Sequence, residues 1–143
     1  MNLLIGYGNT LRADDGVGPA VAQRIAGRRP DTAVLTPFQL LPEHAEEISK
    51  AARVIFIDAT AVSEPGAILT LRLTPDLNAD LGKLHQFAPQ TLLAYAELLY
   101  GHAPPAQLVT VGGYSFAHSD CLTPQMETRL DAVETAVLAL LDA

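Results

Sequence analysis

Short apolar runs alternate with longer amphipathic stretches along most of this chain, and this alternation limits the folds that are open to it. The clearest run is RVIFID at residues 53–58, where β-branched and aromatic residues predict a buried strand that ends in a carboxylate. Further strands are predicted at residues 3–7, 33–35, 67–73 and 108–111, the run at 67–73 as an edge strand. Because strands and helices alternate repeatedly, we expect a three-layer α/β fold. Its central sheet should be mostly parallel, with about five strands and helices on both faces.

The last segment has the strongest helical pattern. Thr123 suits an N-cap, and Pro124 suits the first helical position. An apolar stripe spaced by threes and fours follows and must pack against another element: Met126, Leu130, Val133, Val137 and Leu140. Three further helices are predicted, from the stripe of Val17, Val21 and Ile25 and from residues 41–52 and 89–100.

Length and charge narrow the class of protein. A chain of 143 residues fits one domain, which we expect to span residues 1–143. The net charge is −7, and nine Lys and Arg residues are spread too thinly to form a basic face, so we expect no binding to nucleic acid or to a membrane.

The single cysteine, Cys121, cannot form an internal disulfide, and we expect its thiol to pack near the last helix. The N-terminus has no signal-peptide pattern, and no apolar run approaches the roughly 20 residues of a membrane helix. A monomeric cytoplasmic protein is therefore expected.

Several polar side chains follow predicted strands. In open α/β sheets, ligands bind beyond the carboxyl ends of the strands. Asp14 and Asp15 come after the first strand, Asp58 ends RVIFID, and the polar stretch 74–83 leads to His85. Two carboxylates and one imidazole on one rim would form a mixed oxygen and nitrogen site for a cation such as Ni²⁺ or Zn²⁺, with positions left open for water or a substrate carbonyl. The residues alone do not identify the metal.

Each of these residues also has a structural interpretation. Asp14 and Asp15 can stabilise a helix start, Asp58 can cap a turn, and His85 can lie on the surface or cap the next helix. Dinucleotide binding is disfavoured because Leu11 occupies the place of the third glycine and two acids would repel a pyrophosphate. A nucleophilic triad is disfavoured because there is no G-x-S-x-G motif, and the histidine, serine and aspartate at residues 118–120 are consecutive.

Residues 6–18, GYGNTLRADDGVG, resemble the opening motif of the hydrogenase maturation endopeptidases, G-x-G-N-x-L-x-x-D-[DE]-G-x-G. The resemblance covers most of the chain. It implies that Asp15 is the first metal ligand, with Asp14 as the fallback. Asp58, which closes VIFID, is the implied second ligand, and His85, before a leucine-rich helix, is the third. The backbone of Gly8 and the side chain of Asn9 are implied to position the substrate.

The activity implied by this resemblance is that of a metal-dependent endopeptidase, classified as aspartic-type. Such an enzyme removes the C-terminal extension from the large-subunit precursor of a [NiFe] hydrogenase after nickel has been inserted. The nickel would arrive with the substrate and be bound by Asp15, Asp58 and His85. The resemblance implies that these three residues also contribute to catalysis and that other divalent metals can replace nickel in the site. Segment 112–126 departs from the usual pattern, and segment 38–42 marks a particular branch of the family. Both are expected to tune which hydrogenase is processed. Two alternatives stay open: a chaperone that checks for nickel without cutting, and a nucleotide-binding module.

Overall fold

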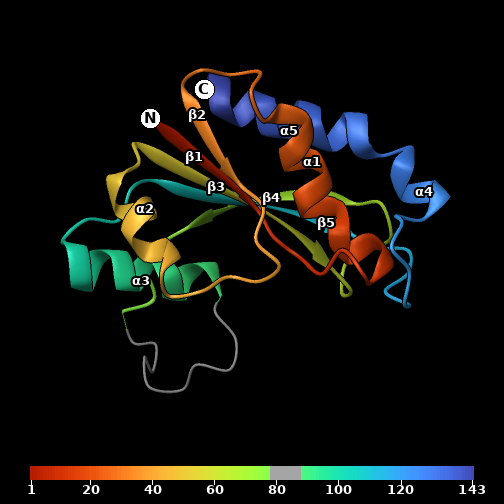
Figure 1. Cartoon of the computed structure of the whole chain (residues 1–143), viewed down its shortest axis with the longest axis horizontal. Coiled ribbons are helices and arrows are strands. Elements are labelled where there is room, and N and C mark those ends of the chain that lie inside the picture. The colour runs from red at the N-terminus through yellow and green to blue at the C-terminus, as the bar shows by residue number, and fades with distance from the viewer. Residues whose placement is uncertain (78–87) are drawn as a thin grey trace.

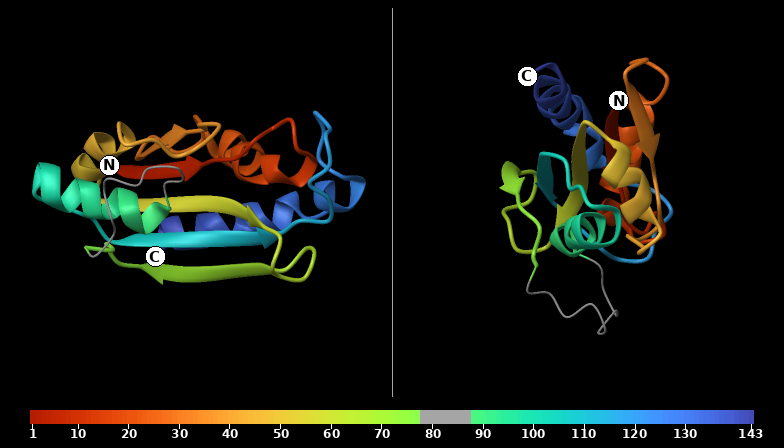
Figure 2. Two further views of the ribbon diagram at one scale, coloured as in Figure 1. Left: turned by 90° about the horizontal axis from the view of Figure 1, so that it is seen from below. Right: turned by 90° about the vertical axis from the view of Figure 1, so that its left-hand side faces the viewer.

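The computed structural model describes residues 1–77 and 88–143 and contains a five-stranded sheet (Figure 1). The strands are β1 (Asn2–Gly6), β2 (Thr32–Leu35), β3 (Arg53–Thr60), β4 (Ile68–Leu73) and β5 (Ala106–Gly112). Their order is β2-β1-β3-β5-β4, which Figure 2 shows from below. All pairings are parallel except β4 with β5, so β4 is an antiparallel edge strand. The predicted mostly parallel sheet is confirmed.

Helices cover both faces of the sheet, as predicted. The helices α1 (Val17–Ile25) and α5 (Leu130–Asp142) lie on one face, and α2 (His44–Lys50) and α3 (Pro89–Tyr100) lie on the other (Figure 1). Side chains alternate along β3, so that Ile57 joins the core under α1 and α5 while Phe56 joins the core under α2 and α3. By the same alternation, Asp58 lies on the α2 and α3 face. No helix in the described ranges has the length and apolar character needed to cross a bilayer.

The predicted last helix is divided in two. Thr123 is the predicted N-cap and accepts a hydrogen bond from the Met126 amide, but the helix that it caps, α4 (Pro124–Glu127), is short. A turn follows, in which the Thr128 hydroxyl donates to the carbonyl oxygen of Gln125, a local bond that favours a bend over a continuous helix. The helix then resumes as α5, and its apolar stripe packs against α1 and the sheet.

Close backbone packing brings the start of α1 up to the ends of the strands. A methyl group added to Gly6 would overlap the carbonyl oxygen of Gly18, and one added to Gly18 would lie 2.5 Å from the carbonyl oxygen of Ile57. Glycine is therefore required where β1, β3 and α1 meet. This contact holds the 3-10 turn η1 (Ala13–Gly16), which carries both aspartates of the sequence motif, above the carboxyl ends of β1 and β3.

Candidate active site

Two of the predicted ligands lie together beyond the carboxyl ends of β1 and β3. Asp58 is near the end of β3, and Asp15 is in η1. The Tyr7 hydroxyl donates a hydrogen bond of 2.9 Å to Oδ2 of Asp58, and the Asn9 amide donates one of 2.6 Å to Oδ2 of Asp15. Both carboxylates are partly buried, and the charge of Asp15 acts on Asp58. The structure therefore brings Asp15 and Asp58 into one site.

The pKa of Asp58 is raised to about 6. Burial is the largest cause, because a carboxylate loses hydration there. The hydrogen bond from Tyr7 opposes the rise, the charge of Asp15 adds to it, and a hydrogen bond with the Ala59 backbone opposes it. A nearby cation would relieve both the lost hydration and the repulsion between the two carboxylates. Two carboxylates this close together are therefore suited to holding a divalent metal ion.

Asp14 has a different role from its neighbour Asp15. It is fully buried, and its carboxylate accepts hydrogen bonds from the amides of Tyr114, Ser115 and Thr123 and from the Thr123 hydroxyl, at 2.8 to 3.3 Å. A carboxylate with this many donors is a structural anchor. Asp14 is therefore not a suitable fallback for Asp15 as a ligand.

The anchor fastens the segment after β5 to the segment after β1. Alongside the Asp14 contacts, the Ala13 amide donates to the carbonyl oxygen of Ser119, and the Ser119 amide donates to that of Leu11. Ala13 has a positive φ of 48°, a left-handed conformation that few non-glycine residues adopt. The segment at 112–126, which the sequence marked as unusual, thus forms one side of the site region.

Gly8 and Asn9 shape the turn that carries Asp15. Gly8 has a φ of 153°, and a methyl group there would overlap the carbonyl oxygen of Asp15. Its amide donates to the carbonyl oxygen of Pro37, and Oδ1 of Asn9 accepts from the Leu11 amide. These contacts are internal, so the part of both residues in positioning a substrate stays a prediction.

His85, the predicted third ligand, lies outside the described residues, as does most of the polar stretch at 74–83. In the ranges 1–77 and 88–143, no three His, Cys, Asp or Glu side chains gather as a metal site, so the proposed set depends on that histidine. The expectation for Cys121 was wrong, because its thiol is exposed and hydrogen-bonds to Asp120 on the surface loop before α4.

Tyr7 was predicted only as the end of a strand, and its contact with Asp58 was not expected from the sequence. The parallel register pairs Gly6 with Ile57, so the next residues along each strand, Tyr7 and Asp58, become neighbours. The spacing between the strand ends could have suggested this contact, but only once the register was known.

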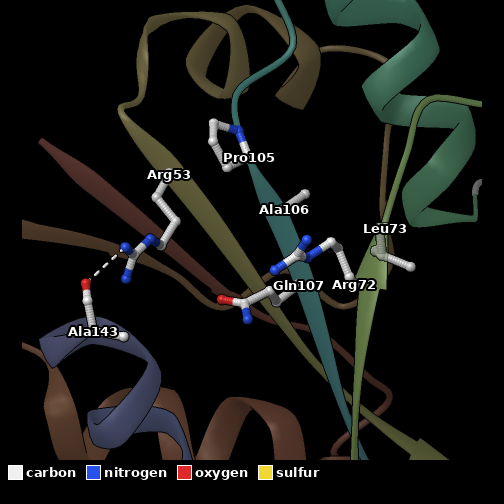
Figure 3. Close-up of a pocket in the computed structure, with 7 residues that line it drawn as sticks. All are labelled: Arg53, Arg72, Leu73, Pro105, Ala106, Gln107 and Ala143. Carbon is white, nitrogen blue, oxygen red and sulfur yellow. Dashed lines mark hydrogen bonds between the residues drawn. The ribbon is translucent and has the colours of Figure 1, made fainter.

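A separate pocket of about 340 Å³ lies at the opposite end of β3 and β5 (Figure 3). Arg53 begins β3 there and donates to the carbonyl oxygens of Leu140 and Ala143, which secures the end of α5. Arg72, Leu73, Pro105, Ala106 and Gln107 complete its lining. Because four residues of β3 lie between Arg53 and Asp58, this pocket is remote from the carboxylate pair.

These features define an α/β protein whose carboxylate pair lies at the carboxyl edge of a mainly parallel sheet. No protein-family model and no curated protein sequence matches the chain, but solved structures share its fold along nearly its whole length. The hydrogenase maturating endopeptidase HybD from Escherichia coli aligns with a TM-score of 0.73 at 23% identity, covering 99% of this chain and 91% of that one.

Two archaeal structures agree with this comparison. The [NiFe] hydrogenase maturation protease HycI from Thermococcus kodakarensis has a TM-score of 0.73 at 21% identity, covering 99% of this chain and 92% of that one. The hydrogenase 2 maturation peptidase from a Thaumarchaeota archaeon has a TM-score of 0.71 at 23% identity, covering 99% and 97%. The chain therefore has the fold of the hydrogenase maturation endopeptidases, as the sequence resemblance implied.

Proposed function

We propose that this protein is an endopeptidase that removes the C-terminal extension from the large-subunit precursor of a [NiFe] hydrogenase after nickel insertion. The observation that carries the proposal is the meeting of Asp15 and Asp58 at the carboxyl edge of the sheet, where α/β proteins bind ligands. The fold shared with the maturation endopeptidases and the motif at residues 6–18 support it. We further propose that the protein acts in the cytoplasm as a monomer.

In this proposal, nickel is part of the substrate. Asp15, Asp58 and His85 bind the nickel that the precursor carries, and binding places the scissile peptide bond beside the carboxylates. Asn9 and Tyr7 each hold one oxygen of a carboxylate, which limits how far the two side chains can turn. Nickel bound there would polarise the scissile carbonyl or lower the pKa of a bound water, and Asp15, Asp58 and His85 share in the catalysis by holding it. Because cleavage would require both the nickel and the C-terminal extension of the precursor, unrelated proteins would not be cut.

The test compares nickel-loaded and nickel-free precursor at equal enzyme concentration, with loss of the extension read by mass spectrometry. We expect only the loaded precursor to be shortened, and we expect casein to stay intact. Equal cleavage of both precursors, or digestion of casein, would show a general protease. A stable complex without any loss of mass would favour the nickel-checking chaperone, and binding of ATP or NAD would favour the nucleotide-binding module.

Two variants test the assigned residues in the same assay. Asp15→Asn and His85→Ala should each abolish processing, because each removes a ligand to the substrate's nickel. Both should keep a cooperative thermal transition close to that of the parent protein, since residues at a site rim contribute little to stability. Full activity in either variant would remove that residue from the site.

A further inference from the structure

Tyr7 lies directly against the carboxylate that the proposed function uses at the end of β3. Its hydroxyl donates to Oδ2 of Asp58 at 2.9 Å. Its backbone amide donates to the carbonyl oxygen of Ile57 at 3.3 Å, which continues the β1 and β3 pairing for one residue beyond Gly6. Backbone and side chain of Tyr7 therefore both bind the last part of β3.

The ring of Tyr7 is held from the side. It contacts Phe56 edge to face, with ring centroids 6.4 Å apart and planes at 85°. Phe56 is completely buried in the core beneath α2 and α3, so it offers a fixed surface. Such an aromatic pair restricts rotation of the tyrosine ring, and its hydroxyl stays directed at Asp58.

The phenol acts as a donor in this contact. An ordinary tyrosine keeps its proton at neutral pH. Asp58 therefore meets a neutral hydrogen-bond donor that takes up one of its two oxygens.

We propose that Tyr7 is a positioning residue that holds Oδ2 of Asp58 and thereby turns the other carboxylate oxygen toward the metal carried by the substrate. This inference deepens the proposed function and rests on it. Groups behind a metal ligand commonly fix its orientation, and their loss weakens metal binding about 10- to 100-fold. If the bond served stability alone, its loss would lower the melting temperature and leave metal affinity unchanged.

The test variant is Tyr7→Phe, which removes one oxygen atom and keeps the ring against Phe56. The probe is Ni²⁺ titrated into the isolated full chain, followed by paramagnetic broadening of backbone amide signals in NMR spectra. We expect a dissociation constant at least about tenfold higher than that of the parent protein. Tyr100→Phe is the matched control, because it removes the same atom from an exposed residue at the far end of α3 and should bind Ni²⁺ normally.

A double-mutant cycle establishes whether Tyr7 acts through Asp58. In the Asp58→Ala background, which removes the oxygen that Tyr7 binds, Tyr7→Phe should cause no further loss of Ni²⁺ affinity. Unchanged affinity in the single variant, an equal loss in both backgrounds, or no Ni²⁺ binding by the parent protein would each overturn the inference. Failure of the proposed function is a separate result: the parent protein would leave nickel-loaded precursor uncut while the Ni²⁺ affinities still differed.

Discussion

Replacing Asp58 by asparagine should make the isolated protein more stable at pH 8, although the same change removes a residue proposed for activity. Burial raises the pKa of this carboxyl from 3.8 to about 6. A shift of roughly two units at 1.36 kcal/mol per unit corresponds to a cost of about 3 kcal/mol for folding with the charged form. Because the side chain is only partly buried and solvent screens its charge, we expect Asp58→Asn to raise the free energy of unfolding at pH 8 by about 1–3 kcal/mol.

The pH dependence follows from which state binds the proton. Between about pH 4 and 6 the native state holds a proton that the unfolded state has released, so this group makes stability fall as pH rises through that range. Above the folded pKa the full penalty is present. Below about pH 4 the carboxyl is neutral in both states, and asparagine resembles it in shape and charge. The Tyr7 hydroxyl can donate to either side chain.

Urea unfolding of the parent protein and Asp58→Asn at pH 8 and pH 4 measures this difference. Comparing the two proteins at the same pH cancels the contributions of the other titrating groups. The variant should gain about 1–3 kcal/mol at pH 8 and almost nothing at pH 4. A variant no more stable than the parent at pH 8, or a gain of equal size at both pH values, would refute the assignment of a raised pKa to Asp58.

The other predictions concern packing and anchoring. Asp14→Ala should lower the free energy of unfolding by about 3 kcal/mol or more in thermal melts, because it leaves several buried donors without an acceptor. Asp15→Ala should lower it by less than about 1 kcal/mol. Equal losses in the two variants would contradict the separate roles of these residues. Gly6→Ala should greatly reduce soluble, folded protein in circular dichroism spectra, because its methyl group would overlap the backbone of Gly18, and a normal yield would show that α1 can shift. Met126→Ala should cost about 2–5 kcal/mol in urea unfolding through a cavity, and a loss below about 1 kcal/mol would mean that the core closes around it.

The fold was predictable because its signals are local. The run at residues 53–58 and the apolar stripe from Met126 specify a buried strand and a buried helical face without reference to distant residues. The antiparallel direction of β4 was not predictable, since a short apolar run carries no information on direction. The division between α4 and α5 coincides with a local hydrogen bond from the Thr128 side chain, which periodicity does not reveal.

The site was only partly predictable. Asp58 could be located because it closes the buried apolar run at residues 53–58, although β3 itself continues to Thr60, and Asp15 came from the sequence motif. Apart from that motif, nothing in the sequence distinguished Asp14 from Asp15, because the donors that bury Asp14 come from residues about a hundred positions away. The contact between Tyr7 and Asp58 could be predicted only from the register of β1 and β3. The role of His85 stays a prediction.

The long-range anchor at Asp14 has a consequence for how the protein is made. Its partner Thr123 lies 109 residues further along the chain, so a nascent chain lacks the donors for Asp14 until most of the protein has been synthesised. Closing a loop of that length costs roughly 4 kcal/mol of entropy, which is recovered only when the sheet and α4 are already in place. The turn after β1 that carries Asp14 and Asp15 should therefore take its final form late in folding. An unfinished chain should be unable to bind a precursor or cut it.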